Sequence, residues 1–459
     1  MAVRAAFSRN RGLDGPDRLR QDSNQQGPGL PLSKYIARMA SNWIDRLAGG
    51  RNAPLPSRTS EEDPDWIDHV KLLGRSPIRA DTELIDQAIR GRSILITGAG
   101  GSIGTGLCQT IARHRPRRIV LVERSEWALY SITKLLEEMK RREPETGQIE
   151  VVSCLADCGD RPRMTSIMRE RDVEIVYHAA AFKHVPIVEC NEIEGIRNNS
   201  FATWRTALAA IDADVSLFVL VSTDKAVHPV GVMGATKRLA ERVIQSLALE
   251  MASKAQGPRF SIVRFGNVLG SSGSVVPLFA QQIARGGPVT ITHAEVSRFF
   301  MSIPEATDLV VQAGAIAQEG PLRANSGEIF VLDMGKRISI RELAEHMITR
   351  AGYRVGKGRG QGRPGEIDLQ ITGLRPGEKL HEELALGDGL RATLHPNILS
   401  CASERIAWER LEASLHRLEA STDRHDVREA RRLLEEMTPD YRPLSESNAS
   451  PTEPRDLLC

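Results

Sequence analysis

Residues 93–104 read SILITGAGGSIG, and this stretch is the clearest indication of the fold class. The run from Ser93 to Thr97 is short and mostly apolar, which is typical of a strand buried on both faces. Glycines follow at positions 98, 101 and 104, and the residues from Ile103 to Arg115 then show helical spacing. A strand, a glycine-rich turn and a helix in this order are the arrangement in which a Rossmann-type fold binds the phosphates of a dinucleotide.

The chain beyond this stretch alternates between strand-like and helical segments. Strand-like runs span residues 118–122, 149–155, 174–178, 217–222 and 261–265, and helical spacing spans 127–139 and 235–249. Such alternation favours βαβ units and a parallel sheet. We therefore predict an α/β fold: a doubly wound Rossmann-type parallel sheet, a smaller C-terminal substrate-binding α/β subdomain, and helical extensions at both ends.

Shifts in composition predict the domain boundaries. Residues 1–65 are expected to form a flexible tail, an amphipathic helix over 31–48 and a linker. Residues 66–270 are expected to form the NAD(P)-binding domain, and 271–400 a substrate-binding portion interleaved with it. Residues 401–443 are expected to be a helical extension and 444–459 a loose tail. The helix over 31–48 could lie on an anionic membrane surface, but docking on its own protein or on a neighbouring subunit is favoured.

Composition excludes several classes of protein. The chain has 459 residues, of which 41% are hydrophobic, so it is not wholly disordered. No apolar run is long enough to predict a transmembrane helix. The 61 basic and 59 acidic residues give a net charge of +2, and aromatic residues make up 4%, so no nucleic-acid partner is expected. The six cysteines include no C-x-x-C pair. We therefore expect reduced thiols, no metal site and a cytoplasmic location.

The glycine-rich turn predicts specific cofactor contacts. Gly98, Gly101 and Gly104 would permit the tight turn, the approach of a pyrophosphate and close helix packing, with Ser102 and Ile103 at the positive helix N-terminus. Glu123 ends the second strand, about twenty residues further on, where a carboxylate accepts the ribose hydroxyls and favours NAD over NADP. Arg124 and Ser125 could soften that preference. Asp157 follows the third strand and either meets the adenine edge or is a turn residue.

A second group of residues predicts the chemistry. Thr223, Asp224 and Lys225 follow the strand-like run 217–222, and Met233 and Lys237 lie on the next predicted helix. In folds of this type a Tyr-x-x-x-Lys pair acts on the substrate, because this spacing places both side chains on one helical face. Here Met233 stands in the tyrosine position, and a thioether transfers no proton. Either the chain is inactive or another group does the acid–base work.

Six segments carry a family resemblance. They are residues 96–104, 178–186 (HAAAFKHVP), 222–227 (STDKAV), 232–238 (VMGATKR), 264–270 (RFGNVLG) and 374–379 (LRPGEK). Together they resemble the CapD-type polysaccharide biosynthesis family, nucleotide-sugar 4,6-dehydratases of the extended short-chain dehydrogenase/reductase superfamily. The resemblance covers roughly residues 70–443. One branch of that family carries methionine in place of the tyrosine, and Met233 agrees with that branch.

The resemblance implies a hydro-lyase that converts UDP-N-acetylglucosamine, or a close UDP-hexose, to a 4-keto-6-deoxy sugar for surface polysaccharide. Tightly bound NAD or NADP, with NAD favoured, would be regenerated in each turnover. Lys225 is then the base at C5, Asp224 the acid toward the C6 hydroxyl, and Thr223 the relay for the C4 proton, through a water beside Met233. A lysine base needs a lowered pKa, which we expect burial and the nearby Lys237 to supply.

The resemblance also places residues around the substrate and cofactor. Lys237 would hold the nicotinamide ribose, and the small residues Ala179 and Ala180 would let the backbone pass close to the cofactor. The predicted substrate residues are Lys183 for a hydroxyl or phosphate, Asn198 for fixing nearby backbone, Asn267 for the nucleotide diphosphate, Arg298 and Arg375 for the diphosphate, and Glu378 for the uridine ribose. Surface ion pairs are the alternative for both arginines.

Three alternatives stay open beside the leading hypothesis of a dehydratase that retains the C5 configuration. One is a dehydratase that inverts C5. Another is a C4 epimerase, against which Met233 argues. The last is a non-catalytic NAD(P)-binding scaffold, against which the joint presence of Asp224, Lys225 and Lys237 argues. The expected partners are a UDP-sugar and further copies of the chain in a homo-oligomer.

Overall fold

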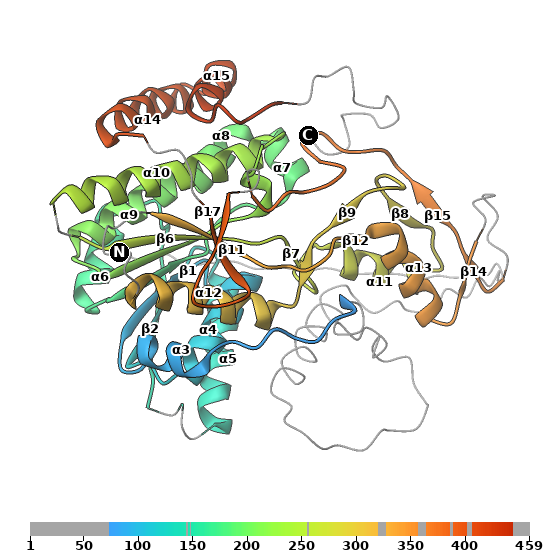
Figure 1. Cartoon of the computed structure of the whole chain (residues 1–459), viewed down its shortest axis with the longest axis horizontal. Helices are drawn as coiled ribbons and strands as arrows, with labels where there is room; N and C mark the ends of the chain where they lie inside the picture. Colours follow the sequence, from blue (N-terminus) through green and yellow to red (C-terminus); the bar gives the residue numbers. More distant parts are fainter. Residues whose placement is uncertain are drawn as a thin grey trace, which may run out of the picture. The chain divides into compact units, whose positions relative to one another are not determined.

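A nine-stranded sheet forms the centre of the fold (Figure 1). In the computed structural model its strands lie in the order β16-β17-β11-β6-β5-β4-β1-β2-β3. Neighbours from β11 to β3 pair in parallel, whereas β17 runs antiparallel to β11 and β16 antiparallel to β17. The strands are Ser93–Thr97 (β1), Arg118–Glu123 (β2), Glu150–Leu155 (β3), Ile175–His178 (β4), Leu217–Val221 (β5), Arg259–Arg264 (β6), Glu328–Leu332 (β11), Leu390–Ala392 (β16) and Ile398–Cys401 (β17).

The structure describes residues 73–143, 146, 148–254, 257–319, 327–356, 364–385, 389–401 and 406–443. All of them belong to the second of the two units into which the chain divides, residues 58–459. The tail and helix predicted over residues 1–65 and the tail predicted over 444–459 lie outside the described residues.

The order of the strands creates a crevice at the carboxyl end of β1. The chain runs outward from β1 through β2 to β3 and then returns to β4 on the other side of β1. All five residues of β1 and all five of β5 are buried, as expected for strands covered on both faces. The reversal between β1 and β4 is the topological switch point, where open α/β sheets bind ligands.

Helices cover both faces of the sheet (Figure 1). α3, α4, α5 and α12 lie on one face, and α6, α9 and α10 lie on the other. Their bounds are Thr82–Ile89 (α3), Ser102–Arg113 (α4), Glu126–Arg142 (α5), Arg161–Glu170 (α6), Ala202–Asp212 (α9), Val232–Lys254 (α10) and Ile303–Glu319 (α12). Together with the parallel strands, these two layers confirm the predicted doubly wound fold.

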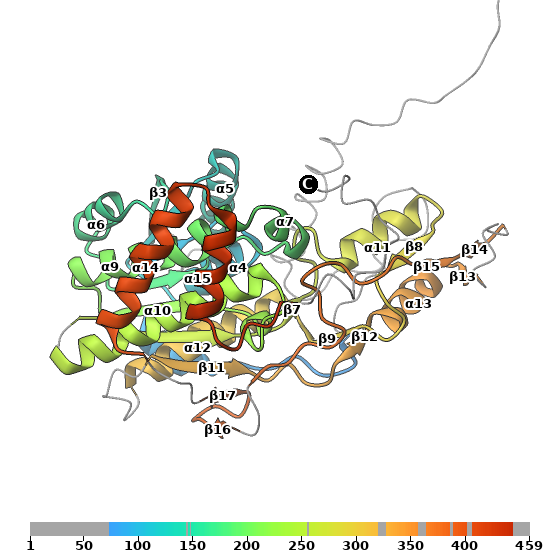
Figure 2. The ribbon, with the colours of Figure 1, turned by 90° about the horizontal axis from the view of Figure 1, so that it is seen from above.

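The C-terminal extension is a pair of helices that packs on the outside of α10 (Figure 2). They are Trp408–Asp423 (α14) and Val427–Met437 (α15). The helical extension predicted over residues 401–443 thus consists of two helices with a turn between them. His425 has a φ of +55° there, and the Asp426 side chain caps the start of α15. No glycine or proline marks this turn, so its position was not visible in the sequence.

A second apolar core lies beyond the carboxyl ends of the main strands. The chain enters it twice, before and after α12 and β11 return to the main sheet. The elements around it are Val275–Ala284 (α11), Ile340–Arg350 (α13), Val289–Ile291 (β8) and Leu369–Ile371 (β15), together with the short strands Asn267–Val268 (β7), Ser297–Arg298 (β9), Phe300–Met301 (β10), Ile338–Ser339 (β12), Arg354–Val355 (β13) and Glu366–Ile367 (β14). This cluster is the smaller C-terminal α/β subdomain of the predicted fold.

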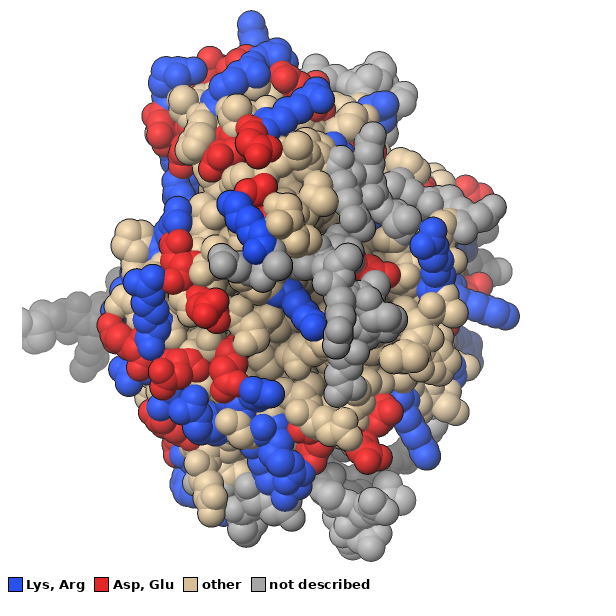
Figure 3. Space-filling model, turned by 60° about the vertical axis from the view of Figure 1, so that its left-hand side comes forward, with Lys and Arg blue, Asp and Glu red and all other residues tan. Residues whose placement is uncertain are grey.

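Acidic and basic side chains are interspersed over the face shown in Figure 3, so neither sign of charge dominates that face. Among the described residues, no helix combines the length and the apolar character that crossing a membrane requires. Cys108, Cys154 and Cys158 are buried free thiols. Cys190 is disulfide-bonded, which contradicts the expectation of reduced thiols for that residue.

Candidate active site

The glycine-rich turn leaves no room for side chains where the chain crosses itself. Gly98 has a φ of +62°, and a Cβ there would lie 2.8 Å from the backbone N and Cα of Ala180. A Cβ on Gly104 would lie 2.0 Å from the carbonyl oxygen of Gly98. The turn is closed by the Gly101 N–H, which donates to the Gly98 carbonyl over 3.0 Å. Positions 98 and 104 therefore require glycine.

The N-terminus of α4 faces a cavity of about 1020 Å³. Gly101 is the N-cap of α4 and supplies no side-chain cap, and the residues from Gly101 to Gly104 line the cavity. The first N–H groups of the helix are thus available to an anion, and the helix dipole favours one there. The bare turn and the uncapped helix fit the pyrophosphate of a dinucleotide cofactor.

The residues predicted to contact the adenosine part of the cofactor form hydrogen bonds within their own turns. The Glu123 carboxylate accepts hydrogen bonds from the N–H groups of Gly100 (3.2 Å), Arg124 (3.0 Å) and Ser125 (3.1 Å). The Ser125 hydroxyl caps α5. Asp157 accepts from the Gly159 N–H over 2.7 Å, which is the turn contact left open above. None of these four side chains lines the cavity, although Glu123 touches the turn that does.

Arg124 and Asn198 form a contact beside this turn. The Arg124 guanidinium lies 4.6 Å from the centre of the Phe182 ring and donates to the Asn198 amide oxygen over 3.3 Å. Asn198 was predicted to fix nearby backbone, and this is wrong. Asn199 does so instead, because its amide group accepts from the Phe182 N–H (2.7 Å) and donates to the Phe182 carbonyl (3.1 Å). Both asparagines lie on the π-helix Ile196–Phe201 (η2), a conformation frequent at functional sites.

His178 ends β4 and is fully buried behind the crevice. Its Nδ1 and Nε2 form hydrogen bonds with the hydroxyls of Thr97 (2.8 Å) and Thr203 (3.0 Å). Burial, with Lys237 nearby, lowers the pKa of His178 to about 3. It is a neutral core residue, and the backbone beyond it, at Ala179 and Ala180, is held by Thr97.

The loop after β5 brings three polar side chains together. The Thr223 hydroxyl donates to Asp224 Oδ1 over 2.9 Å, and the Lys225 ammonium donates to the same oxygen over 3.0 Å. Lys225 Nζ also donates to the Asn267 amide oxygen over 3.0 Å. Asp224 is completely buried, and its Oδ2 has no hydrogen-bond partner. Thr223, Lys225 and Asn267 line the cavity, so Asp224 lies directly behind its wall.

The electrostatic surroundings of Lys225 differ from the prediction. Burial lowers the pKa of its amine, but the nearby carboxylates of Asp224 and Glu382 outweigh burial and raise that pKa above its ordinary value. The expected lowering by burial and Lys237 is therefore wrong, because two carboxylates lie close to this amine. Lys225 rests as an ammonium ion.

Helix α10 carries Met233 and Lys237 to the cavity wall. The Lys237 amine is buried and donates to the Val221 carbonyl at the end of β5, over 2.7 Å. Burial lowers the pKa of Lys237 to about 8, although the nearby Glu241 opposes this. Met233 is 3% exposed and supplies an apolar wall where a tyrosine hydroxyl would otherwise stand.

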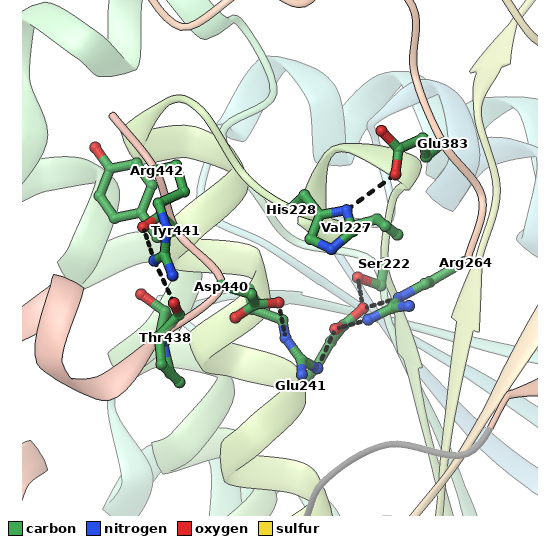
Figure 4. A network of polar contacts seen from close by, with 12 residues as sticks. Ser222, Val227, His228, Glu241, Arg264, Glu383, Thr438, Asp440, Tyr441 and Arg442 are labelled. Atoms are coloured by element: carbon green, nitrogen blue, oxygen red, sulfur yellow. Dashed lines mark hydrogen bonds and ion pairs between the residues drawn. The ribbon is translucent and has the colours of Figure 1, made fainter. Parts of the chain in front are cut away.

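A buried ionic cluster lies behind this loop and helix (Figure 4). The Glu241 carboxylate accepts from the Ser222 hydroxyl (2.7 Å) and from Arg264 Nε (2.7 Å) and Nη2 (2.5 Å). Arg238 bridges Glu241 to Asp440, which follows α15. Burial raises the pKa of Glu241, but the arginines outweigh burial and lower that pKa overall. The cluster ties β5, β6 and α10 to the C-terminal extension.

Five of the predicted substrate residues line the same cavity. Lys183, Asn267, Arg298, Arg375 and Glu378 all line it. Arg298 is buried and donates to Glu378 Oε1 over 3.0 Å, while the Arg375 N–H donates to Glu378 Oε2 over 3.3 Å. Arg298 therefore forms an ion pair, as the predicted alternative held, but the pair with Glu378 lies in the cavity and not on the surface.

Sequence reasoning missed Asn199, Glu241 and Glu382. Glu382 is 2% exposed and lines the cavity, with Oε1 at 3.9 Å from Lys225 Nζ. It follows the LRPGEK segment, which marked this stretch of chain as part of the site. One glutamate after that segment could not be singled out from the sequence, because its burial depends on how the loop after β5 and the second core meet.

The polysaccharide biosynthesis protein family matches residues 94–403. The chain belongs to this family. It is 48% identical over 313 residues to the capsular polysaccharide biosynthesis protein CapD of Staphylococcus aureus, a match that covers 68% of this chain and 48% of that protein. The chain thus spans about half the length of that relative. This membership confirms the family resemblance inferred from the six segments.

Two further comparisons bear on fold and chemistry. Over 305 residues the chain is 31% identical to the UDP-N-acetylglucosamine 4,6-dehydratase (inverting) of Campylobacter jejuni (strain 81-176), covering 66% of this chain and 80% of that enzyme. Among solved structures, it is similar to Pen from Bacillus thuringiensis, with a TM-score of 0.57 and 30% identity, covering 69% of this chain and 88% of that one. The structural likeness supports the Rossmann-type fold.

Proposed function

We propose that the protein is a nucleotide-sugar 4,6-dehydratase that acts on UDP-N-acetylglucosamine or a close UDP-hexose. The observation that carries this proposal is the Thr223-Asp224-Lys225 group, joined by hydrogen bonds at 2.9 and 3.0 Å, at the wall of a cavity that also contains Met233 and Lys237. An acid and an amine side by side suit an elimination, in which one group takes a proton while the other gives one. The C. jejuni relative supports the same reaction class.

The cofactor we infer is a nicotinamide dinucleotide. Gly98, Gly101, Ser102, Ile103 and Gly104 would hold its pyrophosphate, Glu123 its adenosine ribose, and Lys237 its nicotinamide ribose. A carboxylate at position 123 favours NAD over NADP, because it would repel a 2′-phosphate. A bound nicotinamide supplies hydride transfer away from C4 of the sugar and back to C6.

The protein's own residues would move the protons. Thr223 accepts the proton of the C4 hydroxyl and passes its own proton to Asp224 along the 2.9 Å hydrogen bond. Asp224 then gives that proton to the departing C6 hydroxyl, which leaves as water. Lys225 removes the proton from C5, whose acidity the neighbouring ketone raises. This last step needs a neutral amine, so the ammonium of the resting state must first lose a proton.

The cavity wall around the second core would bind the rest of the substrate. Lys183, Asn267 and Arg375 are placed for the diphosphate, and Arg298 joins them if substrate displaces its bond to Glu378. Glu378 would accept the uridine ribose hydroxyls. The C5 outcome is open between retention and inversion, and the inverting C. jejuni relative favours inversion. We infer that the reaction serves the synthesis of surface polysaccharide, because the matching family is described as polysaccharide biosynthesis proteins.

The test is mass spectrometry of UDP-N-acetylglucosamine incubated with the purified protein and catalytic NAD⁺. The proposal requires a product lighter by one water, with no net NADH. Lys225→Ala should abolish that product while the protein still binds NAD. An unchanged mass with a C4 epimer in the NMR spectrum would instead establish an epimerase. No change with UDP-N-acetylglucosamine or UDP-glucose would favour a binding protein.

A further inference from the structure

Glu382 places a third ionisable side chain against the Asp224–Lys225 pair. The side chain is 2% exposed, yet the residue lines the cavity. Its Oε2 is buried and has no hydrogen-bond partner, and its Oε1 lies 3.9 Å from Lys225 Nζ. A buried carboxyl without a hydrogen bond costs stability, so its presence beside a reactive amine calls for an explanation in the chemistry of the site.

The Lys225 amine lies near two carboxyls. It donates to Asp224 Oδ1 at 3.0 Å, and Glu382 Oε1 lies 3.9 Å from it. The other charged groups that act on this pair are Arg298 and Lys379, whose cationic heads are held by Glu378 and by the Val227 carbonyl. Burial raises the pKa of Glu382, and Asp224 raises it further, while Lys225 opposes both. Glu382 is therefore a better proton acceptor than an exposed glutamate.

The three side chains have different access to protons. Thr223 already donates to Asp224, so the C4 hydroxyl proton reaches Asp224 by that route. An Asp224 that has taken this proton cannot also take one from Lys225. Glu382 is then the remaining carboxylate within 4 Å of the Lys225 amine among the described residues.

We propose that Glu382 is a positioning residue that accepts the Lys225 proton reversibly and so frees the amine to act as the base at C5. This inference rests on the proposed dehydratase function. An N–H bond of Lys225 breaks and an O–H bond of Glu382 forms, and nothing is oxidised or reduced. Lys225 takes the C5 proton, and Asp224 gives its proton to the departing C6 hydroxyl, which leaves as water. Once C6 is reduced, Lys225 releases the proton it took, so that its amine is neutral again: the proton goes back to C5 if the configuration is retained, or to solvent while water protonates the other face of C5 if it is inverted. Glu382 then gives its proton back to Lys225, which restores the resting state.

The test compares Glu382→Gln with Glu383→Gln. Glu383 is the matched control, because it is the next residue, its side chain is 44% exposed, and it pairs with His228 (Figure 4). We expect Glu382→Gln to lower kcat by about tenfold or more near neutral pH, with KM within about threefold of the wild type. Its kcat should recover as the pH is raised, because Lys225 then loses its proton to solvent. Glu383→Gln should match the wild type.

Two outcomes would overturn the proposal. One is a Glu382→Gln enzyme with wild-type kcat near neutral pH. The other is a kcat that is lowered equally at every pH, since a structural role would give that result. If Glu382→Gln does not fold, Glu382→Asp decides the matter: it keeps the carboxylate at a greater distance, so it should retain part of kcat without recovery at alkaline pH. Wild-type kcat in Glu382→Asp would count against the proposal.

A second measurement needs no substrate and so separates this inference from the proposed function. The pKa of the Lys225 amine is followed by NMR of isotopically labelled lysine, with Lys225→Arg assigning the signal. Glu382→Gln should lower that pKa by about one unit or more, because the amine loses one of two neighbouring carboxylates. An unchanged pKa would refute the coupling. A wild-type protein that forms no dehydrated product would refute only the proposed function.

Discussion

Gly98 shapes the glycine-rich turn through its backbone conformation, because there is no room for a side chain at this position. Its φ of +62° and the 2.8 Å between a Cβ at this position and the backbone of Ala180 exclude any side chain. We expect Gly98→Ala to weaken NAD binding by at least about tenfold, which corresponds to about 1.4 kcal/mol. Gly74→Ala is the matched control, since Gly74 has a φ of +61° but no atom within 4 Å of the added Cβ. Calorimetric titration with NAD measures both, and equal affinities for the two variants would contradict the account.

Glu241 neutralises two buried arginines. Its partners Arg264 and Arg238 have side chains that are 1% and 3% exposed, so the loss of the carboxylate would leave uncompensated charge in the interior. We expect Glu241→Gln to lower the free energy of unfolding by about 3–5 kcal/mol, the usual cost of removing one partner of a buried pair. Ser222→Ala removes only one hydrogen bond to the same carboxylate and should cost about 1 kcal/mol. Urea unfolding compares them, and similar small losses would show that the cluster is not needed.

At the scale of residues, type and position were predictable but surroundings were not. Thr223, Lys225, Met233 and Lys237 all line the cavity, and their roles there stay predictions. The raised pKa of Lys225 was predictable only in part, because one of the two carboxylates that raise it is the neighbouring Asp224 and the other, Glu382, comes from a distant segment. The side chain that holds the Phe182 backbone is that of Asn199, next to the predicted Asn198, and both residues lie on the π-helix.

Among the elements, α10 depends on a carboxylate at its first turn. The Glu189 carboxylate accepts from the Val232 N–H at the start of α10 over 2.6 Å. It also lies against Gly231 and Gly377, where a Cβ would come within 2.5 and 2.7 Å of its Oε1. Glu189 thus connects the helix of Met233 and Lys237 to the segment of Arg375 and Glu378. Burial raises the pKa of Glu189 from 4.5 to about 7, with Glu192 adding to the effect.

This pKa predicts a stability that depends on pH. The folded protein holds the Glu189 proton more tightly than the unfolded chain, so this contribution is complete below about pH 4.5 and is lost as the pH rises through about 7. Glu189→Gln keeps the acceptor but removes the titration. The free energy of unfolding is expected to fall for the wild type as the pH is raised from about 5 to about 8. For Glu189→Gln this fall should be smaller by roughly 2–3 kcal/mol.

The control for this prediction is Glu194→Gln. Glu194 is exposed and pairs with Arg197, so its substitution should leave the pH dependence of unfolding unchanged. Chemical denaturation at the two pH values measures all three proteins. A Glu189→Gln variant with the same pH dependence as the wild type would show that Glu189 does not titrate in this range.

Strand and helix patterns predicted most elements of the first half of the chain. β1 has the predicted bounds, and β2, β3, β4 and β5 agree within a residue or two, because fully buried strands appear as short apolar runs. The helices of the second half were harder. The break at His425 has no glycine or proline, and the short strands around the second core have only two or three residues each, too few for a periodic pattern.

At the scale of the whole molecule, the site arises where two separately packed cores meet. β1, β4 and β5 bring the turn at Gly98 and the loop at Asp224 to one edge of the main sheet, and the second core supplies Arg298, Arg375 and Glu382 from the other side. The order of the strands follows from the general rules of doubly wound folds. The family resemblance named Arg298, Arg375 and Glu378, which line the cavity, but it did not name Glu382, because the burial of that side chain depends on contacts between distant segments.

In the proposed reaction, hydride leaves C4 and returns to C6 within one active site while water is lost. UDP-N-acetylglucosamine carrying deuterium at C4 tests this directly, with catalytic unlabelled NAD⁺ and analysis of the product by mass spectrometry and NMR. We expect a product that has lost one water and carries the deuterium on C6. A product that has lost water but not retained deuterium at C6, or a substrate that keeps its mass and its label at C4, would contradict it.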